Sequence, residues 1–133
     1  MNQLPTDLHG PLTDLIDAAL EAADPRRPFM VVDGRPTRYA DFADRVARLV
    51  TLLGQKRLEP GDRAGIVSED PAMVAALIVA CLRAGVAVVN LNPAMTAPER
   101  TAAFAAADLA HVFLDRTILD AGPLPAGLAH TVI

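Results

Sequence analysis

The stretch Leu82-Arg83-Ala84-Gly85-Val86-Ala87-Val88-Val89-Asn90-Leu91-Asn92-Pro93 carries the clearest structural signal in this chain of 133 residues. It completes an apolar run that begins near residue 71, and Gly85 is the residue type that most often ends a helix. The residues 86–89 are continuously apolar and predict a short buried strand. Because Arg83 and Gly85 interrupt the apolar segment 72–91, a helix followed by a strand explains it better than a membrane span.

Two more short apolar runs, at 64–67 and 111–114, also predict strands. A helical segment follows the strand at 64–67, and another follows the strand at 86–89. One helix is expected over 71–82, with Ser68 or Asp70 as its cap and Pro71 in its first turn. The other runs from about 96 to 108 and begins with a Thr-x-x-Glu capping box. Strands joined by single crossover helices lie parallel in a sheet covered on both faces. The sequence therefore predicts a three-layer α/β domain in which the strands at about 64–67, 86–90 and 111–114 are parallel neighbours.

The first half of the chain predicts two helices and a β-hairpin. Apolar residues spaced along 12–20 predict an amphipathic helix that ends before Asp24-Pro25. Asp33-Gly34 between two short extended runs predicts a hairpin, placed at the side of the sheet. The next helix carries exposed Asp41/Arg45 and Asp44/Arg48 pairs, and its expected buried face consists of Phe42, Val46, Leu49, Val50 and Leu53. Residues 1–11 are expected to form a flexible lead, residues 12–133 one domain, and residues 130–133 an extended end.

Composition excludes several function classes. The net charge is −4 and the basic residues form no run longer than a pair, whereas nucleic-acid binding calls for a concentrated basic face. Cys81 is the only cysteine, so no internal disulfide is possible and an inert buried thiol is expected. His9, His111 and His130 have no partners at metal-ligand spacing. The start of the chain does not resemble a signal peptide, so the expected location is the cytoplasm. We also expect no metal site and no membrane span.

Four segments in one order resemble the N-terminal segment of the adenylate-forming (AMP-dependent synthetase/ligase) superfamily, in its acyl-CoA synthetase branch. They are the stretch at 82–93, Asp-Gly-Arg at 33–35 with the helix start at 37–42, the turn at 59–63, and the capping box near 96. The resemblance spans about residues 12–120 and implies a partial N-terminal domain of such a ligase. The residues that carry it are Tyr39, Asp41, Gly61, Asp62, Arg63, Arg83, Ala84, Gly85, Asn90, Asn92, Pro93, Thr96 and Glu99, for which we expect structural roles.

The chain also departs from the family pattern. Arg38 stands where the family usually has a helix-capping serine or threonine, so Thr37 is expected to cap one position early. Asn90 replaces a frequent proline, which leaves the substrate subclass open. The family's Ser/Thr/Gly-rich phosphate loop ending in Pro-Lys-Gly has no counterpart, and Lys56 is the only lysine. A phosphoryl transition state needs fixed cations beside it, so we assign no catalytic residue and no cofactor to this chain alone.

The resemblance implies that the complete enzyme activates a carboxylic acid with ATP and Mg²⁺ to an acyl-adenylate and passes the acyl group to CoA or a carrier thiol. This chain is then the N-terminal portion of that ligase and is not catalytic alone. The alternative is a standalone binding or scaffolding domain derived from the same fold. A nucleotide-binding domain of the flavodoxin type is disfavoured because glycine-rich loops after the strands are missing. In either leading case the extended end at 130–133 is expected to leave apolar surface, which the remainder of a ligase or a second copy would cover.

Overall fold

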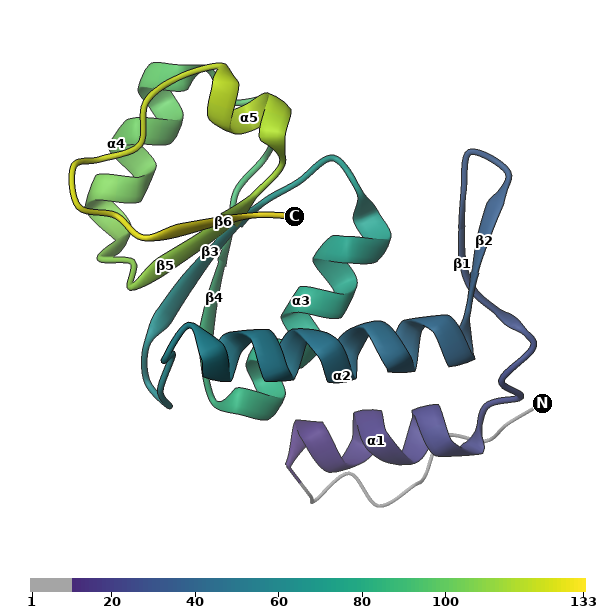
Figure 1. Ribbon diagram of the computed structural model, residues 1–133. Coiled ribbons are helices and arrows are strands. Elements are labelled where there is room, and N and C mark those ends of the chain that lie inside the picture. Colours follow the sequence, from purple (N-terminus) through teal and green to yellow (C-terminus); the bar gives the residue numbers. More distant parts are fainter. Residues whose placement is uncertain (1–10) are drawn as a thin grey trace.

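The computed structural model describes residues 11–133 (Figure 1). Residues 1–10, and with them His9 and almost all of the expected lead, lie outside the described residues. In chain order the elements are α1 (Leu12–Ala22), β1 (Pro28–Val32), β2 (Arg35–Arg38), α2 (Tyr39–Gln55), β3 (Arg63–Val67), α3 (Pro71–Ala84), β4 (Ala87–Asn90), α4 (Ala97–Ala107), β5 (His111–Leu114), α5 (Arg116–Asp120) and β6 (His130–Val132). Within this range, no helix is both long and apolar enough to cross a bilayer.

Four strands form one parallel sheet in the order β4-β3-β5-β6. The expected parallel arrangement is confirmed, but β4 and β5 do not pair with each other, because both pair with β3. The register sets Ala64 opposite Val88 on one side and opposite His111 on the other. After β3 the chain forms β4 on one side of β3, and it then crosses back to form β5 on the other side. The strand β3 is therefore central in the sheet.

Helices cover both faces of the sheet and complete three layers (Figure 1). One core cluster joins α2 and α3 to alternate residues of the central strands, including Ile66 and Phe113. The second cluster lies on the other face, where Val67, Val112 and Leu114 pack against Phe104 of α4. Because successive side chains of a strand point to opposite faces, continuously apolar strands are what a sheet covered on both sides requires.

The strand β4 corrects one prediction. We expected residues 86–89 to form a fully buried strand, and Val86 is indeed buried. Within β4, however, Ala87 and Asn90 are exposed, and Val88 and Val89 are half-buried. The reason is its position at the edge of the sheet, which the apolar composition of a short run does not reveal.

The hairpin β1–β2 is confirmed as a separate two-stranded antiparallel sheet. Asp33 (φ 49°) and Gly34 (φ 74°) both adopt positive φ, as a tight two-residue turn with primed geometry requires. Phe29 fixes the hairpin to α2 by stacking on Phe42, with ring centroids 4.0 Å apart. The hairpin therefore packs on α2 and α3, beside the four-stranded sheet (Figure 1).

The start of α2 corrects two further predictions. The residue at the N-cap is Arg38, no side chain caps the helix, and Thr37 does not take that role. Instead, the first two backbone N–H groups of the helix donate to Arg27 O (3.0 Å) and Pro25 O (3.1 Å), so carbonyl groups of the preceding loop satisfy them. Of the two expected charge pairs, Asp44–Arg48 forms at 2.9 Å, while Asp41–Arg45 does not form among the described residues.

The segment after β5 contains the short helix α5, which was not predicted from the sequence. The Asp115 carbonyl accepts from Ile118 N at 3.1 Å and from Leu119 N at 3.1 Å, which closes its first turn. Ile118 is buried in the second core cluster. The extended end at 130–133 is confirmed as β6, which pairs with β5.

Candidate functional site

The carboxyl ends of β3 and β5 lie side by side, and the chain leaves them in opposite directions. After β3 it crosses through α3 to β4, whereas after β5 it continues through α5 to β6, on the other side of the sheet. Such a topological switch point opens a crevice outside the carboxyl ends of the strands, where open α/β sheets bind ligands. This edge of the sheet is therefore the candidate site.

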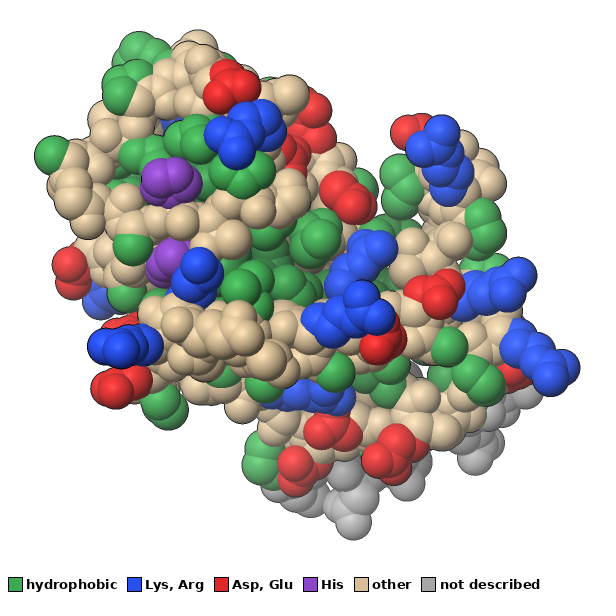
Figure 2. All heavy atoms as spheres, in the orientation of Figure 1, with side chains coloured by type: hydrophobic (Ala, Val, Ile, Leu, Met, Phe, Trp, Pro, Cys, Tyr) green, Lys and Arg blue, Asp and Glu red, His purple; other side chains and the backbone are tan. Residues whose placement is uncertain are grey.

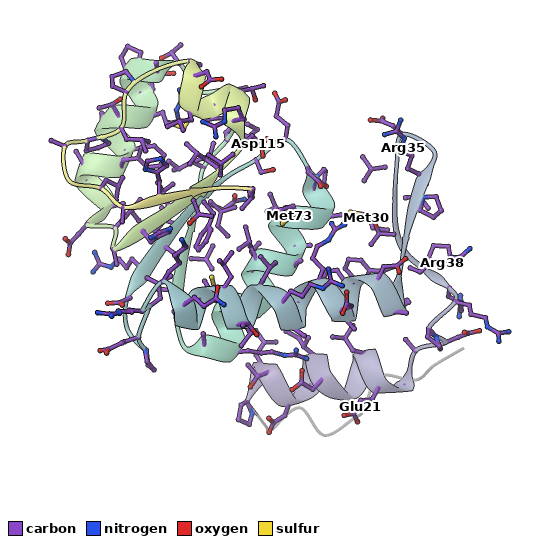
Figure 3. The ribbon with its side chains drawn as sticks, in the orientation of Figure 1. Glu21, Met30, Arg35, Arg38, Met73 and Asp115 are labelled. Atoms are coloured by element: carbon purple, nitrogen blue, oxygen red, sulfur yellow. The ribbon has the colours of Figure 1, made fainter. Side chains whose placement is uncertain are left out.

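Asp115 connects the two strand ends at the switch point. Its carboxylate Oδ2 accepts a hydrogen bond from Glu69 N at 2.7 Å, and its own N–H donates to Val67 O at 3.2 Å. Ser68 Oγ accepts from Asp70 N at 3.0 Å in the same loop. Figure 3 shows Asp115 just beyond β5, beside the loop that leads into α3. The two loops at the switch point are thus held to each other by one charge-assisted hydrogen bond and one backbone hydrogen bond.

The N-terminus of α3 points into this region and carries its own cap. Asp70 Oδ1 accepts from Ala72 N at 2.9 Å and from Met73 N at 3.3 Å, and Pro71 occupies the first turn. These bonds satisfy orphan N–H groups that an external anion would otherwise use. In this chain, α3 offers a capped helix end rather than a phosphate cradle.

A cleft of about 490 Å³ opens between the hairpin, α2 and the start of α3. Arg35 and Arg45 supply guanidinium groups, and Asp33, Glu69 and Asp70 supply carboxylates. Figure 3 shows Arg35 at the hairpin turn, above this cleft. The volume suits a small molecule or part of one, and its charges suit a polar ligand or a polar protein segment. The full lining is Val32, Asp33, Arg35, Thr37, Arg45, Glu69, Asp70, Pro71 and Ala72.

Sequence reasoning did not identify this cleft. Its residues come from three separate segments, at 32–37, 45 and 69–72, and only the packing of the hairpin on α2 and α3 brings them together. The turn Asp33-Gly34 and the cap at Asp70 were each recognised for their local geometry. Nothing in their spacing indicated a shared cleft, and none of the thirteen motif residues lines it.

One group of motif residues lies at the opposite, amino edge of the sheet. Gly61 N donates to Gly85 O at 2.9 Å, and Asp62 O accepts from Ala87 N at 2.8 Å, so this turn aligns β3 with β4. Asp62 Oδ2 also accepts from Glu59 N at 2.8 Å. Arg63 Nη1 donates to Ala107 O at 3.1 Å and lies 3.9 Å from an Asp108 carboxylate oxygen. These hydrogen bonds fix the positions at which β3 and β4 begin.

The residues Arg83, Ala84 and Gly85 end α3. Gly85 has a left-handed φ of 70°, and a Cβ there would lie 3.1 Å from Pro60 Cβ, so glycine fits both the cap and the close approach. The Arg83 guanidinium pairs with the Asp17 carboxylate, with Nε 2.9 Å from Oδ1, and thereby ties α1 to α3. Tyr39 and Asp41 lie in the first turn of α2, where the Tyr39 ring meets Phe29 edge-on at 5.5 Å.

The remaining motif residues follow β4. Asn90 ends the strand, and Asn92 Oδ1 accepts from Ala94 N at 2.9 Å in the turn that contains Pro93. Thr96 donates to Glu99 Oε2 from its backbone N (2.9 Å) and from its Oγ1 (2.8 Å), which confirms the predicted capping box. These two hydrogen bonds lower the pKa of the Glu99 carboxyl. All five residues shape the loop and the helix start.

Two buried titratable side chains, Cys81 and His111, belong to the core rather than to a site. Burial raises the pKa of the Cys81 thiol to about 11, which keeps it protonated and unreactive, as predicted. His111 is buried, and its Nε2 lies 2.8 Å from Thr131 Oγ1 of β6. Burial, then the charge of Lys56, then that of His130 lower the pKa of the His111 ring. Among residues 11–133, no cluster of His, Cys, Asp or Glu is arranged to hold a metal ion.

Comparisons with known proteins give a family match and a curated relative. A family model described as "AMP-binding enzyme" matches residues 18–131. A curated relative, 3-oxocholest-4-en-26-oate–CoA ligase from Rhodococcus rhodochrous, is 28% identical over 125 residues, which are 92% of this chain and 22% of that protein. The chain therefore spans about a fifth of the length of this relative.

Solved structures share the fold at low sequence identity. The nonribosomal peptide synthetase FmoA3 in an AMPPNP-bound form aligns with 98% of this chain and 14% of its own length, at a TM-score of 0.80 and 22% identity. The N-terminal subdomain of NpsA from Klebsiella oxytoca, in complex with 3-hydroxybenzoyl-AMSN, covers 91% of this chain and 30% of its own, at 0.78 and 19%. The O-succinylbenzoate–CoA synthetase of Bacillus subtilis, in complex with AMP, covers 86% of this chain and 30% of its own length, at a TM-score of 0.70 and 17% identity.

Proposed function

Because the chain belongs to the AMP-binding enzyme family, we propose that it is the N-terminal portion of an ATP-dependent ligase that joins a carboxylic acid to CoA or a carrier thiol through an acyl-adenylate. The match over residues 18–131 carries this proposal. A curated CoA ligase that aligns with 92% of the chain supports it.

The residues of this chain do not by themselves form a binding site for a nucleoside triphosphate. The sequence holds no Ser/Thr/Gly-rich phosphate loop, and Asp70 already caps the helix end at the switch point. Lys56, the only lysine, is the C-cap of α2 and acts electrostatically on His111, which begins β5 at the amino edge of the sheet. This lysine is therefore at the opposite edge of the sheet from the cleft, whose cations are the guanidinium groups of Arg35 and Arg45. ATP, Mg²⁺ and CoA are proposed for the complete enzyme, and no step is assigned to this chain alone.

In this proposal, residues 12–133 supply part of a large domain, and the thirteen motif residues hold its turns and helix ends. Hydrogen bonds of several of them support a structural role: those of Gly61 and Arg63 join two elements, that of Asn92 closes a turn, and those of Thr96 with Glu99 cap a helix. The remainder of a ligase is the proposed partner, with self-association of the chain as the alternative arrangement. The single buried thiol supports a reducing compartment, so we place the protein in the cytoplasm.

Exchange of labelled pyrophosphate into ATP tests the proposal. The purified 133-residue chain should give no exchange above the no-enzyme background with any carboxylic acid, since it has neither a phosphate loop nor a suitably placed lysine. The protein isolated from its native cells should exchange, and its intact mass should exceed 14.0 kDa or a partner chain should accompany it. A native product of 14.0 kDa that neither exchanges nor has a ligase partner would instead support the scaffolding alternative.

A further inference from the structure

The hairpin β1–β2 projects from the body of the molecule and has two different faces (Figure 1). Residues directly opposite in an antiparallel pair share a face, so Val31 and Pro36 lie together, with Arg38 two residues further on the same side. Val31 is 58% exposed, one of two large hydrophobic side chains exposed to this degree among residues 11–133. Met30 and Thr37 occupy the other face, and Figure 3 shows Met30 pointing toward α3 and Arg38 pointing away from it.

Positive charge gathers on and beside this outer face. Arg26 and Arg27 lie in the exposed loop that leads into β1, and Arg38 ends β2 on the outer face. Arg35 begins β2 opposite Val32, so it lies on the other face and lines the cleft. None of the four guanidinium groups lies within 4.0 Å of a carboxylate oxygen of residues 11–133, although the Arg26 backbone N–H donates to Asp24 Oδ1 at 2.9 Å. Residues 24–38 carry four arginines and two aspartates, whereas the rest of the chain carries eight basic and fourteen acidic residues. Figure 2 shows the basic side chains along this side of the molecule.

We propose that the outer face of the hairpin, made of Val31, Pro36 and Arg38 with Arg26 and Arg27 beside it, binds the surface of an anionic phospholipid bilayer. Guanidinium groups would contact lipid phosphates, and Val31 with Pro36 would enter the headgroup region. A bilayer suits this face because its apolar residues lie on a projecting element, where a protein partner would need a matching groove. The acidic residues of the body do not prevent binding, since charges beyond about 8 Å are screened at physiological ionic strength. This inference stands independently of the proposed ligase function.

The size of the effect follows from the charges involved. Each arginine held near an anionic bilayer contributes about 1 kcal/mol, which is roughly a five-fold change in the partition coefficient. Removing three of them should therefore weaken binding on the order of 100-fold. Val31→Asp should weaken binding as well, because it places a carboxylate where an apolar side chain would enter. Neither change touches a buried residue, so both variants should remain folded.

Co-sedimentation with vesicles tests the proposal, using vesicles of phosphatidylcholine alone and vesicles that also contain phosphatidylglycerol. The 133-residue chain should sediment only with the anionic vesicles, and less so as salt is raised. Arg26→Gln/Arg27→Gln/Arg38→Gln should lose binding. The matched control, Lys56→Gln/Arg57→Gln/Arg116→Gln, removes the same charge from exposed sites elsewhere and should bind like the wild type. Circular dichroism establishes that each variant is folded.

Three results would overturn the proposal. These are no binding of the folded wild type to anionic vesicles, full binding by the arginine variant, or an equal loss in the control variant, which would indicate only general charge. Retention of the wild type on an immobilised acidic polypeptide, without vesicle binding, would assign the face to an acidic protein and also reject the bilayer.

Discussion

At the scale of single residues, the side chains that fix this fold are those that complete hydrogen bonds at helix ends and loops. Asp70 is the clearest case, because one carboxylate oxygen accepts from two backbone N–H groups at the start of α3. That helix contributes five buried residues to the core, so an unsatisfied end destabilises the helix layer that covers one face of the sheet.

We expect Asp70→Ala to lower the free energy of unfolding by about 1–2 kcal/mol, the usual cost of losing an N-cap. Urea denaturation monitored by circular dichroism measures it. Asp120→Ala is the matched control, because Asp120 is exposed at the end of α5, and its loss should change stability by less than about 0.5 kcal/mol. Equal losses in the two variants would show that the cap does not stabilise the helix.

His111 should make the stability of the protein depend on pH. Its folded-state pKa is lowered, first by burial, then by Lys56 and His130, so below about pH 6.5 the unfolded chain takes up this proton more readily than the folded one. Stability should therefore be highest above that pH and fall as the pH drops through the lowered folded-state pKa. His111→Asn should flatten this part of the profile of unfolding free energy against pH.

The exposed His130 provides the control for that measurement. His130→Asn removes a minor cause of the shift, so the dependence should persist with a small change. A profile in His111→Asn identical to that of the wild type would assign the acid sensitivity to other groups.

At the scale of elements, the sequence predicted those whose signals are local. The turn Asp33-Gly34 and the capping box at Thr96 each lie within a few residues and are found where they were expected. Of the two caps expected for α3, Ser68 or Asp70, the structure has Asp70, with Pro71 in the first turn. Continuous apolar character also predicted the parallel sheet correctly. The same apolar character could not distinguish the central strand β3 from the edge strand β4. Strand order depends on the crossover connections, and these do not change the residue composition of either strand.

The incorrect or missing expectations share one cause, which is contact between segments far apart in the chain. The start of α2 has no side-chain cap because the carbonyl groups of Pro25 and Arg27 reach its first N–H groups. The helix α5 is short and has few helical positions to signal it, and it is held by packing of Ile118. The cleft at the carboxyl edge likewise depends on how the hairpin packs, so it could not be derived from spacing.

The joint between α4 and α5 offers a test at this scale. Arg100 of α4 is buried, and its guanidinium donates to Met95 O at 3.1 Å and to Ile118 O at 3.3 Å. Arg100→Leu should lower the free energy of unfolding by about 1–3 kcal/mol, because two carbonyl groups lose a charged donor. Arg116→Leu, at an exposed position of α5, is the control. Hydrogen exchange should show faster opening around residues 116–120 in the Arg100 variant alone.

At the scale of the whole molecule, the sheet has two outer edges, β4 and β6. The edge at β6 is flanked by apolar surface, since Ile133 packs against the main core cluster and Figure 2 shows hydrophobic side chains in the hollow between β6 and α2. Backbone groups along such an edge are available to another strand unless something covers them. In the proposed ligase this edge would adjoin the rest of the large domain.

The isolated chain should therefore associate through β6 as its concentration rises, and the direction of the backbone N–H groups gives a selective test. Ile133 N donates to Leu114 O of β5 at 3.1 Å, and inward and outward groups alternate along a strand, so the Val132 N–H faces outward. Val132→Pro removes that donor without removing a bond to β5, a position where an edge strand accepts proline. Light scattering across a concentration series should give a mass above 14.0 kDa for the wild type and a mass nearer to the monomer for Val132→Pro.

Thr131→Pro is the counterpart, because the Thr131 N–H faces β5 and its loss should destabilise β6 itself. A wild-type chain that stays monomeric at high concentration would show that β6 is a self-sufficient edge and would favour the scaffolding alternative over a missing partner.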